Sequence, residues 1–245
     1  MKILGITSCD STNEEIKRRI AQAPEGSPLP PAIAALEQTA GKGRNGRSFS
    51  SPYGMGLYLS IPMEVSSMEQ ALCVTPMAAV CVCKAIEDIT GLECGIKWPN
   101  DVFYNGRKLC GILTESVLKD THLYLALGIG INLAQDEEHF PEELRKTAIS
   151  IKQACGAMVS PYDMANCLVP HIEDMIKALP GDKAEYLEYY RERCITVGKK
   201  INVVFAEGLK PRPGEATGIA DNFGLYVDWS PYEHELLRNG EVSIR

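Results

Sequence analysis

We predict an α+β fold, in which a mixed, largely antiparallel sheet with helices is followed by a small β-barrel. Strand-like and helix-like segments alternate through the first 194 residues, and hairpin signals among them favour antiparallel pairing. Beyond Cys194 the chain changes to short strand-like runs separated by Gly, Pro and Asn-Gly turns, which is typical of a small barrel. The sequence therefore predicts two domains, residues 1–194 and residues 195–245.

The first elements of the chain are short and well punctuated. Ile3–Ile6 is expected to form a strand. Ser11 is expected to N-cap a helix, and Glu14, three positions on, to complete a capping box. A Pro-rich turn, Pro24–Pro31, leads into a predicted strand at Ala32–Leu36.

The middle of the chain contains the longest elements. Gly56–Met63 is expected to be a strand, because its apolar residues alternate with Tyr58 and Ser60. Residues 67–90 form a mostly apolar helix, in which Pro76 either starts the main body or kinks it. Cys94–Trp98 is expected to be another strand.

Asn105-Gly106 is a strong hairpin signal before a strand at Lys108–Glu115. Leu123–Leu133 is a further β-like apolar run, and residues 161–193 are mainly helical, with Pro161 well placed at a helix start. The short C-terminal strands are expected around Val197, Ile201, Val203 and Phe205, and at Thr217–Ala220, Leu225–Trp229, Glu233–Leu237 and Val242–Ile244.

Composition limits the class of protein. A net charge of −7 and a pI near 5.2 argue against a general nucleic-acid binder, whose surface would be basic. Nothing resembles a signal peptide or a roughly 20-residue apolar span, so we expect a cytoplasmic protein with no membrane partner. The nine cysteines include no Cys-x-x-Cys pair and the four histidines are dispersed, which favours reduced core thiols over structural zinc.

The segment Gly41–Arg47 places three cationic side chains and three glycines within seven residues of this acidic chain. Such a loop cannot build a core, but its glycines allow close backbone approach and its arginines can grip phosphate or carboxylate through paired hydrogen bonds. Taken alone, the segment could equally be a solvated, disordered surface loop.

Other segments accompany this loop in a fixed order: Asp10–Asn13, Gln38, Lys97–Asp101, Arg107–Ile112 and Gly128–Asn132. Over essentially the whole chain they resemble the biotin protein ligases, also called biotin–[acetyl-CoA carboxylase] ligases. The resemblance implies a class II synthetase-like catalytic domain and an SH3-like C-terminal domain. Lys42 stands where the family usually has the first loop arginine, so charge is kept but bidentate geometry is lost.

The resemblance also implies a reaction. The enzyme would activate biotin with ATP as biotinyl-5′-AMP, with Mg²⁺ present, and transfer it to a specific lysine of a biotin carboxyl carrier protein. Because only ten residues precede Ser11, we expect the form that lacks an N-terminal DNA-binding domain, with no specific DNA partner. A side-by-side homodimer through the main sheet would follow family habit.

Site residues are implied at matching positions, with Lys108 and Arg44 as the catalytic pair. Biotin binding falls to Ser11, Thr12, Asn13, Gln38, Gly41, Lys42, Gly43, Arg44, Trp98, Lys108 and Gly128. ATP binding falls to Arg44, Arg47, Lys97, Asn100, Asp101, Lys108 and Asn132. Asp101 would either orient Lys108 or hold Mg²⁺ through water. Near the C-terminus, Glu241 and Arg245 are candidate ligand-side or interdomain contacts.

Several of these residues have a purely structural interpretation as well. Lys108 could be an ordinary exposed strand lysine, although its spacing of eleven from Lys97 and the following Leu-x-Gly-Ile favour function. Trp98 could be a core aromatic. Gly128 and Gly130 imply close approach of biotin or adenine to the backbone, or alternatively a β-bulge.

Two other functions compete with the leading one. A lipoate or octanoate ligase of related fold would use the same acyl-transfer chemistry, and Trp98 with the Arg/Gly loop favours biotin over it. A non-catalytic vitamin-binding or DNA-binding regulator belongs to another class, against which the negative charge and Lys108 argue.

Overall fold

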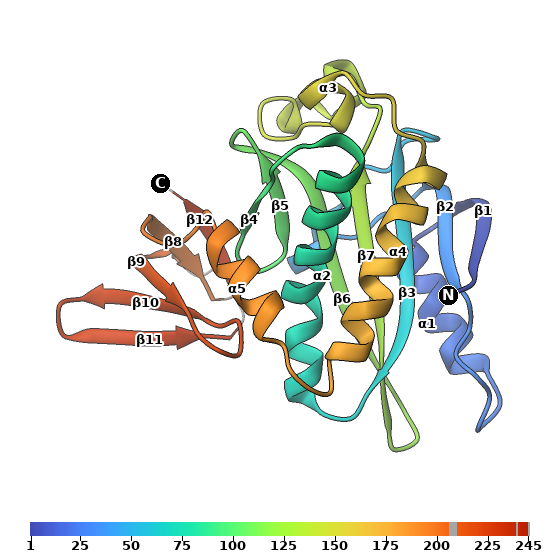
Figure 1. The fold of residues 1–245 in the computed structure, drawn as a ribbon, viewed down its shortest axis with the longest axis horizontal. Coiled ribbons are helices and arrows are strands. Elements are labelled where there is room, and N and C mark those ends of the chain that lie inside the picture. Colours follow the sequence, from blue (N-terminus) through green and yellow to red (C-terminus); the bar gives the residue numbers. More distant parts are fainter. Residues whose placement is uncertain (206–209, 239, 245) are drawn as a thin grey trace.

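The computed structural model describes residues 1–205, 210–238 and 240–244. A large sheet has the strand order β1-β2-β3-β7-β6-β5-β4, and its β1–β2 pair is parallel while the other pairs are antiparallel (Figure 1). Its strands are β1 (Ile3–Cys9), β2 (Ala32–Gln38), β3 (Gly56–Val65), β4 (Gly95–Lys97), β5 (Asp101–Tyr104), β6 (Arg107–Lys119) and β7 (His122–Asn132). The predicted mixed, largely antiparallel sheet is confirmed.

Helices cover both faces of this sheet. They are α1 (Thr12–Gln22), α2 (Met68–Thr90), α3 (Ile151–Cys155), α4 (Pro161–Ala178) and α5 (Ala184–Arg193), with short 3₁₀ turns η1 (Arg44–Gly46), η2 (Glu137–His139) and η3 (Glu142–Leu144). Figure 1 shows α2 and α4 side by side in front of the sheet, and α1 lies behind it. Among the described residues we find no helix with the length and apolarity needed to cross a bilayer.

The period-two pattern of β3 decides which side chains meet which layer. Leu57, Leu59 and Ile61 point into the main core with α2, whereas Tyr58 and Ser60 point to the α1 face. Pairing with β7 then places Gly128 and Gly130 on that same α1 face, because they lie opposite Ser60 and Tyr58. At Tyr58 and Ser60, the face that carries α1 is therefore polar, whereas α2 covers the opposite face.

The predicted capping box at α1 is wrong. Ser11 occupies the N-cap position with an extended backbone, but its side chain makes no capping hydrogen bond. The amide of Thr12 donates instead to Oε1 of Gln38, at 2.9 Å. The carboxylate of Glu14 is engaged by lysines. A residue from β2 therefore caps this helix, and local spacing could not show it.

Other local predictions are confirmed. Asn105 and Gly106 both have positive φ, 47° and 74°, as a two-residue type I′ turn between β5 and β6 requires. Pro161 begins α4, and the hydroxyl of Ser160 accepts from the Asp163 amide at 3.1 Å. α2 begins at Met68 and continues through Pro76, so Pro76 does not start the helix.

The register of β7 with both neighbours runs unbroken through Gly128 and Gly130, so the β-bulge alternative is wrong. The helical stretch expected over residues 161–193 is divided into α4 and α5 by a break around Gly181. Most predicted strands are longer in the structure, as β3 and β6 illustrate.

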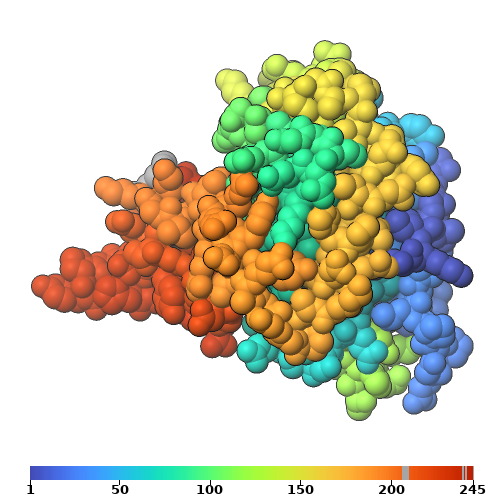
Figure 2. Space-filling model, viewed as in Figure 1, coloured from blue at the N-terminus to red at the C-terminus, as the bar shows by residue number. Residues whose placement is uncertain are grey.

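The C-terminal segment forms a second, antiparallel sheet with the order β11-β10-β9-β8-β12. Its strands are β8 (Lys200–Val204), β9 (Arg212–Ile219), β10 (Leu225–Ser230), β11 (Glu233–Leu237) and β12 (Glu241–Ile244). It forms a lobe that projects from the main body, as Figure 2 shows, and agrees with the expected SH3-like domain. Arg245 and the side chain of Glu241 lie outside the described residues, and the boundary between residues 194 and 195 stays a prediction.

Candidate active site

A cavity of about 450 Å³ opens on the α1 face of the large sheet. Its walls come from the start of α1, the basic loop (Gly41–Arg47), the turn between β4 and β5, and strands β6 and β7. Of the residues predicted to bind biotin or ATP, all except Gly41 border it, namely Ser11, Thr12, Asn13, Gln38, Lys42, Gly43, Arg44, Arg47, Lys97, Trp98, Asn100, Asp101, Lys108, Gly128 and Asn132. Segments up to about 120 residues apart in sequence therefore meet at one place.

The polar end of the cavity is a network of neutral groups. Oε1 of Gln38 accepts from the hydroxyl of Thr12 at 3.1 Å, and Nε2 of Gln38 donates to Ser51 at 2.8 Å. Oγ of Ser60 lies 2.7 Å from Oγ1 of Thr12 and 2.6 Å from Oδ1 of Asn13. Uncharged donors and acceptors, fixed in place by one another, line this end.

Ser11 and Asn13 secure the helix start beneath this network. The Ser11 amide donates to Asp10 at 2.8 Å, and the Ser11 side chain is buried. Nδ2 of Asn13 donates to Leu113 O at 3.0 Å and to Glu115 Oε2 at 2.9 Å, which ties α1 to β6.

The two glycines of β7 do have close neighbours, but the neighbours belong to the protein. A Cβ at Gly128 would lie 2.5 Å from Oδ1 of Asn13, and a Cβ at Gly130 would lie 2.6 Å from the ring of Phe49. The expected close approach is therefore made by Asn13 and Phe49 in this structure. Any side chain at either position would displace them.

The basic loop connects β2 to β3 and makes its own internal contacts. The Phe49 amide donates to Gly41 O at 2.8 Å, and the Gly43 amide donates to Arg47 O at 2.7 Å. A Cβ at Gly41 would lie 2.4 Å from Phe49 O, so glycine is required where the two limbs cross. The tip turns through Asn45 and Gly46 with positive φ.

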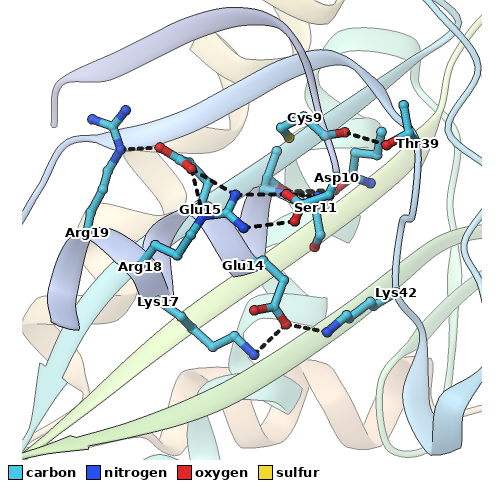
Figure 3. A network of polar contacts seen from close by, with 12 residues as sticks. Cys9, Asp10, Ser11, Glu14, Glu15, Lys17, Arg18, Arg19, Thr39 and Lys42 are labelled. Atoms are coloured by element: carbon cyan, nitrogen blue, oxygen red, sulfur yellow. Dashed lines mark hydrogen bonds and ion pairs between the residues drawn. The ribbon is translucent and has the colours of Figure 1, made fainter. Parts of the chain in front are cut away.

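One limb of the loop is held to α1 by charge. The Glu14 carboxylate lies between Lys17, at 2.7 Å, and the ammonium of Lys42, as Figure 3 shows. Hydrogen bonds from Lys17 and then Lys42 lower the pKa of Glu14 below its ordinary value. Nearby, paired bonds from Arg18 hold the pKa of Asp10 well below its usual range.

The tip of the loop reaches the turn between β4 and β5. Arg44 donates to Oδ1 of Asn100 at 3.1 Å, while Nδ2 of Asn100 donates to Ile112 O at 2.9 Å. This places the Arg44 guanidinium over the cavity beside the turn. Lys97 approaches from the same turn, its ammonium 5.5 Å from the centre of the Phe103 ring.

Lys108 is held by side chain and backbone. Its ammonium lies 2.8 Å from Oδ1 of Asp101. Its amide donates to Thr147 O at 2.7 Å, and its carbonyl accepts from Ile149 at 2.9 Å. Of the two roles predicted for Asp101, orienting Lys108 is the one that this contact serves.

The side chains at this site fit the expected Mg²⁺ poorly. Asp101 is the carboxylate predicted for Mg²⁺, and it is already paired with Lys108. The described part of the chain has no cluster of three or more His, Cys, Asp or Glu side chains that could hold a metal ion.

Trp98 and Asn132 are engaged by the protein. Trp98 is buried in the main core, and its Nε1 donates to Phe223 O of the C-terminal lobe at 2.9 Å, so the core-aromatic alternative describes its environment. Nδ2 of Asn132 donates to Ile149 O at 3.2 Å, and its Oδ1 accepts from Gln135 at 3.1 Å. Asn132 therefore supports the cavity wall through the segment that follows β7.

Sequence reasoning missed three residues that shape the cavity. Ser60 could have been found, because its alternation with Leu59 and Ile61 puts a polar side chain on the α1 face. Tyr58 shares this alternation, whereas Phe49 had no such signal; the two rings meet edge-on with centroids 6.5 Å apart. They lie under the basic loop because the loop folds back on β3.

Comparison with known proteins gives a consistent result. A family model described as the biotin/lipoate A/B protein ligase family matches residues 5–132. The chain is 36% identical over 156 residues to the bifunctional ligase/repressor BirA of Bacillus spizizenii, and spans 46% of its length. It is 33% identical over 239 residues to the bifunctional ligase/repressor BirA of Escherichia coli, covering 96% of this chain and 72% of the relative.

Among solved structures, the biotin protein ligase from Aquifex aeolicus in complex with biotin and ATP matches the whole fold. Its TM-score is 0.80 at 25% identity, with 100% of this chain and 98% of that chain covered. The similarity thus includes both the large sheet with its cavity and the C-terminal lobe.

Proposed function

Since this chain belongs to the biotin/lipoate A/B protein ligase family, we propose that it is an ATP-dependent biotin–[biotin carboxyl carrier protein] ligase. It activates biotin as biotinyl-5′-AMP and then transfers the biotinyl group to a specific lysine of a carrier protein. The solved Aquifex relative, which holds biotin and ATP, supports this assignment.

One observation carries the proposal. Two cationic side chains from separate segments, Lys108 from β6 and Arg44 from the basic loop, border one cavity whose far end is neutral and polar. Each cation is oriented by a partner from the same turn, Asp101 for Lys108 and Asn100 for Arg44. A ligand with one polar neutral end and one anionic end fits this arrangement.

In the first half-reaction, a carboxylate oxygen of biotin attacks the α-phosphorus of ATP. A mixed anhydride forms as the bond between the α-phosphorus and the pyrophosphate oxygen breaks. Two anions must approach each other, so charge neutralisation and alignment supply the catalysis. Lys108 neutralises the carboxylate and the α-phosphate. The phosphates of ATP are bound by Arg44, Arg47 and Lys97. Mg²⁺, as the counter-ion of ATP, would further neutralise the phosphates.

In the second half-reaction, the deprotonated amine of the carrier lysine attacks the anhydride carbonyl. AMP leaves with the bonding electrons as the amide forms, and the nitrogen loses its remaining extra proton. Until the carrier arrives, the basic loop keeps water from the anhydride.

The neutral network favours biotin over lipoate or octanoate. The ureido ring of biotin offers N–H donors and a carbonyl acceptor to Thr12, Gln38 and Ser11. An octanoyl chain or a dithiolane offers neither, so these buried groups would face an apolar ligand. A site built to hydrogen-bond its ligand rejects analogues that lack the matching groups.

An ATP–pyrophosphate exchange assay with each acid separates these functions. We expect exchange with biotin and background exchange with octanoate, lipoate or no acid. Exchange that is as fast with octanoate as with biotin would assign the chain to the lipoate branch. No exchange with any acid would favour a non-catalytic vitamin-binding regulator.

Further properties belong to the same proposal. We place the protein in the cytoplasm, without a specific DNA or membrane partner, and propose a side-by-side homodimer through the large sheet. Cell fractionation and sedimentation velocity test these points. Limited proteolysis tests a domain boundary between residues 194 and 195.

A further inference from the structure

Phe223 lies at the junction between the main body and the C-terminal lobe, in the turn that joins β9 to β10. Its side chain is 3% exposed, and its backbone has a φ of 62°. The turn is closed by hydrogen bonds from the Phe223 amide to Ala220 O and from the Ala220 amide to Gly224 O, both 2.9 Å.

A phenylalanine is an unfavourable choice for this backbone conformation. Left-handed φ values suit Gly and Asn, and for a bulky residue they carry strain that the surroundings must offset. The chain has both favoured types next door, at Asn222 and Gly224. The ring therefore has a role that outweighs the local backbone preference.

The contacts of Phe223 show what the ring and backbone hold. Its carbonyl accepts from Nε1 of Trp98 at 2.9 Å. Its ring meets the fully buried ring of Tyr190 edge-on, with centroids 5.6 Å apart and planes at 85°. The Tyr190 hydroxyl donates in turn to Pro99 O at 3.3 Å. Phe223 thus supports Trp98 directly and Pro99 through Tyr190.

Trp98 and Pro99 directly precede two residues that line the cavity. Asn100 and Asp101 follow them in sequence, and these are the partners of Arg44, at 3.1 Å, and of Lys108, at 2.8 Å. A shift of the turn would therefore move the partners of both cations together. The Trp98 amide is also fixed by Thr196 at 3.0 Å, so the turn is held from the C-terminal side at more than one point.

We propose that Phe223 is a positioning residue for the active-site turn, acting through Trp98 and Tyr190 on the residues that orient Arg44 and Lys108. The proposal rests on the proposed ligase function for its kinetic consequence, and on geometry alone for its effect on the turn. It gives the C-terminal lobe a definite task, which is to hold residues 98–101 in register with the two cations.

The kinetic test compares Phe223→Ala with Val227→Ala. Val227 is also fully buried in the C-terminal lobe, beside Gly214 in β9, and it belongs to neither the β9–β10 turn nor the active-site turn of residues 98–101. We expect Phe223→Ala to lower kcat/KM for biotin-dependent ATP–pyrophosphate exchange roughly ten- to a hundredfold, as small misplacements of catalytic groups do. Val227→Ala should stay within about twofold of wild type, even with a similar loss in Tm.

Phe223→Tyr keeps the aromatic ring, so its ATP–pyrophosphate exchange should stay within about threefold of wild type. The proposal is overturned if Val227→Ala loses as much exchange as Phe223→Ala, or if Phe223→Ala stays within twofold of wild type. Should Phe223→Ala not fold, Phe223→Leu takes its place, since it keeps the apolar volume without the edge-on ring contact, and it is judged by the same limits.

A second measurement needs no enzymatic activity. Native-state amide hydrogen exchange of the ligand-free protein should be roughly tenfold faster in Phe223→Ala at Trp98 and Ile112, whose amides bond Thr196 and Asn100 O. The Ile129 amide in β7 is the internal reference. If the wild-type protein shows no biotin-dependent ATP–pyrophosphate exchange, the ligase function is refuted and only the hydrogen-exchange measurement tests the positioning role. Unchanged hydrogen-exchange rates at Trp98 and Ile112 would then overturn that role.

Discussion

Lys108 projects from β6 into the cavity with its ammonium paired to Asp101 at 2.8 Å. In the proposed mechanism it neutralises the biotin carboxylate and the α-phosphate, so its loss would remove positive charge at the reacting atoms. We expect Lys108→Ala to reduce biotin-dependent pyrophosphate exchange by at least about a hundredfold, the usual cost of one electrostatic group. Stability should change by less than about 1 kcal/mol, because the side chain is partly exposed.

Lys146→Ala is the matched control, since Lys146 is an exposed lysine of the loop that precedes Lys108's backbone partner Thr147. It should leave exchange unchanged. A folded Lys108→Ala protein with near-wild-type exchange would remove Lys108 from the mechanism.

Arg44 belongs to the loop that covers the cavity. Biotinyl-5′-AMP is a reactive mixed anhydride, and the loop gains ligand contacts through its cations only when an anion is bound. Removing Arg44 should weaken retention of the intermediate by about 1–3 kcal/mol, the range for a charge-assisted hydrogen bond. Arg44→Gly should therefore release the adenylate and acylate bystander proteins.

Trapping of released adenylate in a stopped-flow assay measures this directly. Arg44→Lys keeps the charge without the bidentate geometry, so its release rate should lie between those of wild type and Arg44→Gly. Release from Arg44→Gly that is no faster than from wild type would show that the loop does not act as a lid.

At the scale of elements, the Glu14 carboxylate joins helix α1 to the basic loop through Lys42, and it also pairs with Lys17 one turn further along the same helix. Its pKa is lowered in the folded protein from an ordinary value of 4.5. A lowered carboxyl pKa stabilises the fold above the unfolded-state value, and this contribution is lost as the pH falls below 4.5 and through the folded-state pKa. The pairs are partly exposed, so the contribution is on the order of 0.5 kcal/mol.

Urea unfolding of Glu14→Gln and wild type at several pH values tests this. The variant should be less stable by about 0.5 kcal/mol at pH 7, and the difference should diminish as the pH falls below 4.5 and shrink in about 1 M salt. Trypsin should also cut the basic loop faster in the variant at pH 7. A stability difference that persists unchanged at pH 3 would assign the effect to packing.

At the scale of the whole molecule, net charge decides how the protein meets nucleic acid. With a formal charge of −7, the chain repels the phosphate backbone, whose neutralisation supplies most DNA affinity. We expect no sequence-specific DNA binding by this chain. Fluorescence anisotropy with defined and random duplexes at two salt concentrations measures it; nanomolar, salt-sensitive binding that prefers one duplex would contradict the expectation.

The sequence by itself determined most elements and the segments that line the cavity. Asn105-Gly106 specified its turn, Pro161 its helix start, and the alternation in β3 its buried face, because each of these signals is local in the backbone. The cations and glycines of Gly41–Arg47, together with the accompanying segments, also indicated most of the residues that form the cavity walls.

Only the tertiary structure decided which groups these residues meet. Gln38 caps α1 from 26 positions away, and the indole of Trp98 bonds a carbonyl 125 positions on. Phe49 and Asn13 fill the space beside Gly130 and Gly128. These partners depend on how strands and loops fold back on one another in space, and the free energy of such long-range contacts leaves no periodic trace in the sequence.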